Sequence, residues 1–334
     1  MRRAVITGLL MAALLFVPPL FFAAPEGDAP APPEGTETVL PRKPERKEES
    51  ADAAVTLRVL IGEETEEMTL AEYLPGVVRG EMPASFEPQA LAAQAVAERT
   101  YICYHLRQGR KTAHPDADVC ADPTCCSAWT SREKAREKWG DRFEEYEARI
   151  ETAVAETDGQ VILYEGEPIL AAFHSSSAGV TASSGDVWSR DLPYLRSVAS
   201  PEDADTVPNY YSVVTVPAEE FRAVFLAAHP EAKLEGDAAG WIAEVKENGS
   251  GRVESASVGG VSVRGTELRS LYGLRSACFT AAAEDGNVVF RVTGYGHGVG
   301  MSQYGANRLA AEGKTWREIL AWYYTGVTIG PMPG

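Results

Sequence analysis

Basic side chains are scarce in this chain of 334 residues, where 31 Lys and Arg stand against 48 Asp and Glu. The net charge is -17 and the pI about 4.8. Nucleic acids bind surfaces with clustered Lys and Arg, so the shortage argues against a nucleic-acid partner. Anionic lipid should repel such a surface as well. A largely neutral polymer such as a sugar chain fits this charge balance better.

Cysteine is also scarce, with five residues in the whole chain. Cys103 and Cys278 are isolated and typical of ordinary buried residues, while the other three lie close together. This number and clustering do not suit the disulfide scaffold of a small secreted domain. Apolar residues make up 45% of the sequence, which is ample for a large core, and the chain has no internal repeat.

The N-terminus carries a membrane-targeting pattern. Arg2 and Arg3 precede an almost unbroken apolar run from Ala4 to Ala24, roughly the 20 residues that a membrane helix needs. The arginines favour a cytoplasmic N-terminus and export of everything after it. The run is short enough for a cleaved signal peptide, but Phe22 spoils the small-x-small cleavage site. We therefore predict an anchor at residues 1–24, with the remainder outside the cytoplasm in either case.

Residues 25–53 are rich in Pro, Glu and Lys and have few large apolar side chains. Such a stretch cannot bury enough surface to offset its chain entropy. We predict an extended tether here, followed by an extracytoplasmic catalytic domain at residues 54–334 that opens with a strand from Val55 to Ile61.

The body itself shows segregated helix and strand patterns. Thr69 and Glu72 form a capping box, and the helix that they begin ends near Gly80. Further helices are predicted over 88–107, with Gly109 as C-terminal cap, and over 131–157, 217–228, 265–271, 302–312 and 316–324. Strands are predicted over 160–164, 169–174, 252–259 and 287–292. The fold class is therefore α+β: a helical N-terminal part packed with a β-rich C-terminal part around a substrate cleft, preceded by an N-terminal membrane helix.

Three segments carry most of the functional signal. The first comprises residues 73–83 (YLPGVVRGEMP) and 87–101 (EPQALAAQAVAERTY), the second 173–181 (FHSSSAGVT), and the third 294–306 (GYGHGVGMSQYGA). All three resemble the stage II sporulation protein D family and occur in the family's order. The likeness covers nearly everything after residue 55, and the anchor and tether are similar too. Ala178-Gly179 departs from the Gly-Gly pair that the family has after the serines.

The resemblance implies a peptidoglycan lytic transglycosylase that acts during engulfment in sporulation, on glycan strands preferably stripped of stem peptides. It matches the family's catalytic Glu to Glu81 and an important helix Arg to Arg99. From its local sequence alone, Glu81 would be a solvated surface carboxylate at the end of a helix. We expect a raised pKa for Glu81 as general acid, and we expect Arg99 to hold substrate or stabilise developing charge.

The second and third segments supply candidate substrate-binding residues. These are His174, Ser175, Ser177, His297, Gln303 and Tyr304. His297 either contacts sugar or braces its glycine-rich loop, and Tyr304 either binds glycan or belongs to the core. A phosphate loop is disfavoured because no lysine follows in Walker spacing. A serine hydrolase is disfavoured because no Gly-x-Ser-x-Gly elbow is present.

The clustered cysteines form the pattern His114, Cys120, Cys125 and Cys126. An imidazole and thiolates in a short loop are typical zinc ligands. The likeness to the clostridial members of the family, which carry a His/Cys zinc cluster at this place, implies a structural zinc ion. Cys125 is the least certain ligand because it adjoins Cys126. The alternative is a disulfide from Cys120 to Cys125 or Cys126, which export would favour.

The resemblance also implies partners and a location. The partners are peptidoglycan glycan strands, a partner amidase and membrane proteins of the engulfment complex. The location is the cell membrane at the forespore septum, on the mother-cell side, with a single span. Two other functions remain open: a non-catalytic wall-binding module that stimulates an amidase, and a zinc hydrolase built on the cysteine loop.

Overall fold

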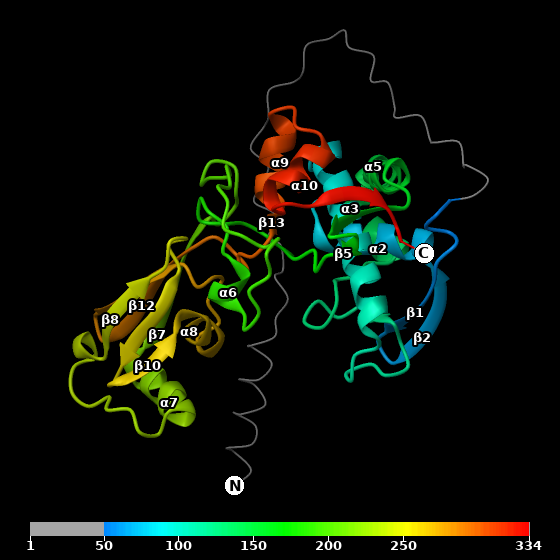
Figure 1. Ribbon diagram of the computed structural model, residues 1–334. Coiled ribbons are helices and arrows are strands. Elements are labelled where there is room, and N and C mark those ends of the chain that lie inside the picture. Colours follow the sequence, from blue (N-terminus) through cyan, green and yellow to red (C-terminus); the bar gives the residue numbers. More distant parts are fainter. Residues whose placement is uncertain (1–49, 334) are drawn as a thin grey trace. The chain divides into compact units, whose positions relative to one another are not determined.

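The computed structural model describes residues 50–333, so the predicted anchor and most of the predicted tether lie outside it. Within this range, no helix has the length and apolar character to cross a membrane. Helices and several small sheets are segregated along the chain, which confirms the α+β class (Figure 1).

Helices occur along the whole of the described chain. They are α2 (Leu70–Glu81), α3 (Pro88–Gln108), α4 (Arg132–Trp139), α5 (Phe143–Glu156), α6 (Ser184–Val187), α7 (Ala218–Ala228), α8 (Gly265–Leu271), α9 (Gln303–Ala311) and α10 (Trp316–Tyr323). The single helix predicted over 131–157 was wrong. Gly140 adopts a φ of 52°, and the 3-10 turn Gly140–Arg142 separates α4 from α5.

The strands form small sheets rather than one large one. One sheet joins β2 (Glu64–Thr69), β1 (Thr56–Ile61) and β3 (Val119–Cys120), and another joins β14 (Thr328–Pro331), β4 (Gln160–Tyr164) and β5 (Glu167–Pro168). A third joins β11 (Phe279–Glu284), β12 (Asn287–Thr293) and β7 (Tyr211–Pro217), and a fourth joins β10 (Val261–Arg264), β9 (Val253–Val258) and β8 (Ile242–Glu247). β6 (Phe173–His174) pairs in parallel with β13 (Met301–Ser302), so the strand predicted over 169–174 is reduced to its last two residues.

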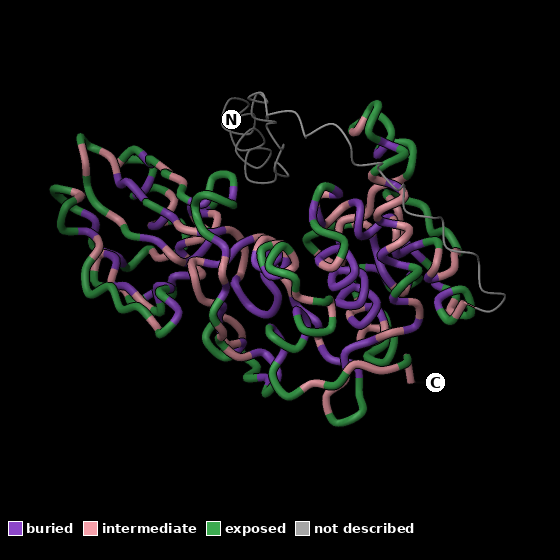
Figure 2. Tube along the Cα trace, turned by 90° about the horizontal axis from the view of Figure 1, so that it is seen from above, coloured by how far each residue is buried: buried purple, intermediate pink, exposed green. Residues whose placement is uncertain are grey.

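The described chain has two hydrophobic cores. The first draws on α2, α3, α5, α9 and α10, and the second is confined to residues 214–292, around Phe221, Phe225 and Phe290. Figure 2 shows the buried stretches running through both the helical part and the sheets. The sequence did not predict the second core, which lies in the chain between the segments 173–181 and 294–306.

Helix α3 is the centre of the first core. It packs against α2, α5, α9, α10 and β4. Alanines at 90, 92, 93, 95 and 97 are all buried, and their small side chains let neighbouring helices approach closely. The helix therefore also encloses the two ionisable residues in its middle, Glu98 and Arg99, neither of which is exposed.

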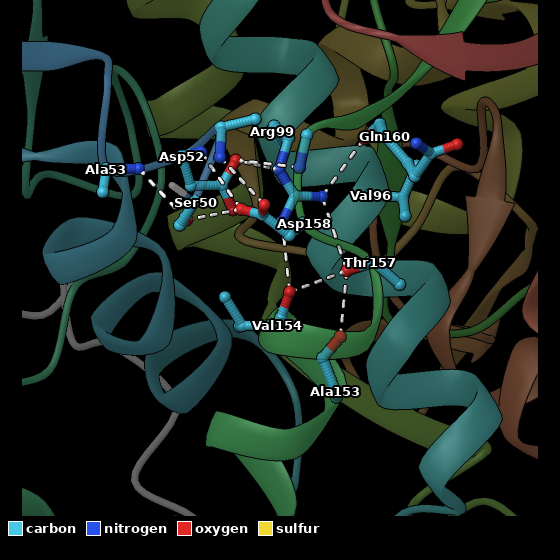
Figure 3. Close-up of polar contacts among 12 residues, drawn as sticks. Ser50, Asp52, Ala53, Val96, Arg99, Ala153, Val154, Thr157, Asp158 and Gln160 are labelled. Carbon is cyan, nitrogen blue, oxygen red and sulfur yellow. Dashed lines mark hydrogen bonds and ion pairs between the residues drawn. The ribbon is translucent and has the colours of Figure 1, made fainter. Parts of the chain in front are cut away.

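Arg99 is held by the N-terminal end of the described chain (Figure 3). Its Nε and Nη2 atoms donate to the two carboxylate oxygens of Asp52, each at 2.6 Å, and its Nη1 atom donates to the Gln160 carbonyl at 3.1 Å. Asp158 fastens the same segment by accepting from Ser50 Oγ and the backbone N–H groups of residues 51 and 52. Residues 50–53 thus belong to the folded body, which begins earlier than the predicted boundary at 54 because Asp52 is buried against Arg99.

We expect Asp52→Ala to lower the free energy of unfolding by about 3–5 kcal/mol, because it leaves the Arg99 charge buried without a partner. Urea denaturation of the full chain measures this loss. Glu312→Ala is the matched control: it breaks the exposed pair with Arg308, which should cost less than about 0.5 kcal/mol. Equal losses in the two variants would show that the buried pair does not anchor the segment.

Candidate active site

Glu81 is the last residue of α2, where the backbone turns towards α3. Its Oε1 atom accepts a hydrogen bond of 2.5 Å from the backbone N–H of Ala128, and its own carbonyl accepts one of 2.9 Å from Gln303 Nε2. Burial raises the pKa of Glu81 to about 7, and the Ala128 hydrogen bond opposes that rise. At neutral pH the group is therefore close to half protonated, as suits a group that donates and then accepts a proton.

A second carboxyl group lies beside Glu81 and was not predicted. Glu98 on α3 is fully buried, accepting hydrogen bonds from Ser127 Oγ at 3.0 Å and from Gln94 Nε2 at 3.1 Å. Burial and then the negative charge of Glu81 raise the pKa of Glu98 well above its usual range. The only sequence signal was a charged residue amid the alanines of a helix, next to the arginine that attracted attention.

The loop at residues 127–130 contacts both carboxyl groups and rests directly on α2. The Thr130 N–H donates to the Gly76 carbonyl at 2.9 Å. A Cβ on Gly80 would lie 2.5 Å from the carbonyl oxygen of Ala128, and one on Gly76 would lie 2.1 Å from Nε1 of Trp129. Glycine at both positions is therefore what allows the loop to approach closely enough for the Ala128 N–H to reach Glu81.

The His/Cys cluster immediately precedes this loop. The ligand atoms of His114, Cys120, Cys125 and Cys126 all lie within 4.8 Å of one another. Nδ1 of His114 hydrogen-bonds the Ala117 carbonyl at 3.0 Å, which directs Nε2 to within 3.4 Å of Cys126 Sγ. The cysteines are free thiols in this structure, and the predicted disulfide alternative is not formed in it.

Arg99 lies apart from Glu81. All three guanidinium nitrogens donate to Asp52, Thr157 or carbonyl groups on the side of α3 that faces the N-terminal segment. Neighbouring residues on a helix point about 100° apart, so Glu98 faces the carboxyl site while Arg99 faces away. The structure therefore gives Arg99 an anchoring contact, and nothing in its geometry supports the predicted contact with substrate.

Two of the predicted residues of the second segment, His174 and Ser177, face inwards, while Ser175 is half-buried. His174 Nε2 and Ser177 Oγ are 2.7 Å apart, and both side chains are buried. Burial, followed by the nearby His297 and Arg252, lowers the pKa of His174. The carbonyl of Ser175 accepts from the backbone N–H of Tyr304 at 3.1 Å. The Ser175–Tyr304 bond joins the second segment to the third, and their burial leaves the side chains of His174 and Ser177 no access to a glycan.

Glu202 connects the same two segments and was also missed. It is buried and accepts hydrogen bonds from the Ser177 N–H at 2.6 Å, from Ser200 Oγ and from Ser302 Oγ. Its sequence neighbourhood, a proline and acidic residues, is typical of a solvated loop, so no local pattern could have identified it.

His297 braces its loop. Its Nδ1 atom accepts from the Val299 N–H at 3.1 Å, and its ring lies 5.4 Å from Trp188 and 5.7 Å from His174, measured between ring centroids. Burial, with Arg269 and Arg252 nearby, lowers the pKa of His297 to about 4. The imidazole is thus neutral at physiological pH and is not a general acid.

Gln303 and Tyr304, at the start of α9, are the predicted binding residues that do reach the Glu81 region. Gln303 holds the backbone of Glu81, as noted above, and the ring of Tyr304 meets that of Phe86 edge-on at 4.9 Å. The third segment therefore contacts the turn between α2 and α3 that begins at Glu81. A surface pocket of about 390 Å³ at the far end of α3, lined in part by Tyr104, Arg190 and Tyr194, includes none of the predicted site residues.

Comparison with known proteins gives a consistent picture. Residues 62–164 match the family described as "Stage II sporulation protein". The chain is 33% identical to "Stage II sporulation protein D" of Bacillus subtilis (strain 168), over 98% of this chain and 96% of the relative. It is 36% identical to the protein of the same name from Bacillus amyloliquefaciens, over 79% of this chain and 75% of that one. A B. subtilis protein named "Amidase enhancer" is 28% identical, over 77% of this chain and 40% of its own.

We expect Gly80→Ala to destabilise the protein by about 1–3 kcal/mol, because the added Cβ collides with the Ala128 carbonyl. Alanine normally stabilises a helix relative to glycine, so the sign of the change is diagnostic. Thermal unfolding of the full chain measures it. Gly249→Ala, where a Cβ meets nothing within 4 Å, is the control and should leave stability nearly unchanged. A stabilised Gly80→Ala variant would contradict the close packing of the loop.

Proposed function

The chain belongs to the stage II sporulation protein D family, and on that premise we propose that it is a peptidoglycan lytic transglycosylase with Glu81 as its single acid and base. The observation that supports this most is the setting of Glu81. It is a partly buried carboxyl group with a pKa of about 7, and a backbone N–H stabilises its ionised form. A group of this kind can give up a proton and take one back within a single turnover.

The proposed reaction has two proton transfers. Protonated Glu81 gives its proton to the glycosidic oxygen as the bond from that oxygen to C1 breaks. The C6 hydroxyl oxygen of the same sugar then bonds to C1, and the Glu81 carboxylate takes the hydroxyl proton. The products are a 1,6-anhydro end and a chain with a free hydroxyl, so no water is consumed and Glu81 is regenerated.

Glu98 does not convert the site into an ordinary glycosidase. Retaining and inverting enzymes need two carboxyl groups that flank the scissile bond. Glu98 is fully enclosed and committed to Ser127 and Gln94, so it can touch neither the sugar nor an attacking water. The enclosure favours a mechanism in which the substrate supplies its own nucleophile.

The second candidate is a wall-binding module that stimulates an amidase, favoured by the likeness to the protein named "Amidase enhancer". Such a module needs no carboxyl group poised near neutral pH, and for that reason we place the transglycosylase first. A partner amidase that strips stem peptides is compatible with both functions. We further propose that the protein acts from the membrane, outside the cytoplasm, with the engulfment complex at the forespore septum on the mother-cell side.

We also propose that the His/Cys cluster holds zinc. The convergence of one imidazole nitrogen and three sulfur atoms fits a tetrahedral ion, and the Ala117 carbonyl fixes the imidazole orientation as such ions require. Four protein ligands would make the ion structural. The ligands would then fix the beginning of the loop that carries Ser127 and Ala128, and the chemistry would remain on Glu81.

We expect the full chain to produce 1,6-anhydro-muramyl ends from peptide-free glycan strands. The Glu81→Gln variant should lower the rate of this cleavage by at least about 10³-fold. Mass spectrometry of the products measures this. Glu63→Gln, at an exposed position, is the control and should behave as the wild type. Reducing ends in place of anhydro ends would mean that water attacks. Binding without cleavage would favour the amidase-stimulating module.

For the metal, we expect about one zinc ion per chain, as a four-ligand site requires. Cys126→Ser should lose most of the metal and lower the melting temperature, whereas Cys278→Ser, outside the cluster, should change neither. Elemental analysis and thermal unfolding with and without a chelator provide the measurements. The zinc proposal would be wrong if the wild type contained no metal and its melting temperature were the same with and without the chelator.

A further inference from the structure

Glu98 is a buried carboxyl group beside Glu81 to which the proposed reaction gives no role. Its charge would be costly where it lies, because none of the ion pairs within residues 50–333 includes it. A buried carboxyl group without a cation is normally accommodated as the neutral acid.

Burial and the charge of Glu81 favour the neutral form of Glu98, and they outweigh the hydrogen bonds from Ser127 and Gln94, which lower its pKa. The ionisable groups that act on it, or on which it acts, are Glu81 and Tyr73 from α2, Tyr101 from α3 itself, Cys126 and Tyr324. None of these is a cation. The phenols of Tyr73 and Tyr101 have raised pKa values, with burial as the main cause, and stay uncharged at neutral pH. Glu81 is thus the nearest group that changes charge in the physiological range.

Geometry links Glu98 to Glu81 through two consecutive residues. Ser127 donates its hydroxyl to Glu98 Oε2 at 3.0 Å, and the next residue, Ala128, donates its backbone N–H to Glu81 Oε1 at 2.5 Å. A displacement of Ser127 therefore also displaces the Ala128 N–H. Gln94, one helical turn before Glu98, holds the other Glu98 oxygen at 3.1 Å. The side chain is thus fixed on both sides.

We propose that Glu98 is a positioning residue that, as a neutral acid, holds Ser127 and thereby aims the Ala128 N–H at Glu81. This inference rests on the proposed transglycosylase function. Glu98 touches no substrate: it acts on Glu81 through the loop. Its neutrality also leaves Glu81 as the one member of the pair that ionises during turnover.

The proposal separates charge from hydrogen bonding, and two kinds of variant test the two effects. Glu98→Gln is permanently neutral and keeps an acceptor for Ser127, so it should resemble the wild type. Glu98→Ala and Ser127→Ala remove the link to the loop from either side. Losing the Ala128 hydrogen bond destabilises the carboxylate form of Glu81, so its pKa should rise in both.

The experiment follows the side-chain carboxyl ¹³C signal of Glu81 against pH in the full chain, with Glu81→Gln to assign it, alongside the pH profile of glycan cleavage. In Glu98→Gln the Glu81 midpoint should stay within about 0.3 units and kcat within about threefold of the wild type. In Ser127→Ala the midpoint should rise by at least about 0.5 units and kcat should fall about tenfold, with KM little changed. Glu98→Ala should follow Ser127→Ala if it folds.

A Glu81 midpoint that falls by a unit or more in Glu98→Gln would overturn the proposal, because it would show that Glu98 carries a charge in the wild type. An unchanged midpoint in Ser127→Ala would overturn it as well. The titration needs no turnover, so it stands apart from the proposed function. A wild type that does not cleave glycan but titrates as described would refute the transglycosylase and leave the link between Glu98 and Glu81 in place.

Discussion

Two ionisable residues stand next to each other in the fully buried middle of α3, and the body is organised by the way each is accommodated. Arg99 cannot lose its charge, so it requires the Asp52 carboxylate, and this requirement fastens the N-terminal segment against α3 and the turn after α5. Glu98 can become neutral, so it needs only hydrogen bonds, which it takes from Gln94 and the loop at 127–130. One side of α3 thereby holds the N-terminal segment of the body, and the other holds the loop that contacts Glu81.

The second and third signature segments act mainly as supports. Residues 173–181 and 294–306 are joined by a parallel strand pair, by isolated bridges and by the carboxylate of Glu202. The glycines of the third segment make room for other parts of the protein. A Cβ on Gly300 would meet the Ala172 carbonyl at 2.0 Å. Only its end, at Gln303 and Tyr304, reaches the Glu81 junction.

The sequence predicted well what depends on local chemistry. The capping box of Thr69 and Glu72, Pro88 at the start of α3 and Gly109 at its end are all present, because such signals act within one turn of a helix. β2, which is acidic and mostly exposed, was missed since its pairing with β1 comes from a hairpin and not from an apolar pattern. The predicted α+β class followed from the order of the elements, while the division into two cores did not.

Part of the candidate site was predicted from the sequence, and part of it was missed. Glu81 was identified through the resemblance, and the structure adds the physical setting that the pattern could not give. Glu98, Ser127 and Glu202 act through partners tens of residues away, and no local spacing encodes such contacts. Arg99 was also identified through the resemblance, but it is fully buried and its guanidinium group faces the N-terminal segment rather than Glu81.

The second core has one further consequence. The N–H of Gly294 donates to the carbonyl of Tyr210 at 2.8 Å, so the stretch between them leaves and rejoins the rest of the chain at a single place. Such a stretch is a closed loop whose ends the surrounding structure already holds together. It has a hydrophobic core of its own, and because the cost of closing a loop grows only slowly with length, changes in its length add little closure entropy. The stretch between Tyr210 and Gly294 is therefore the part of the body where we expect insertions and deletions to be tolerated most easily.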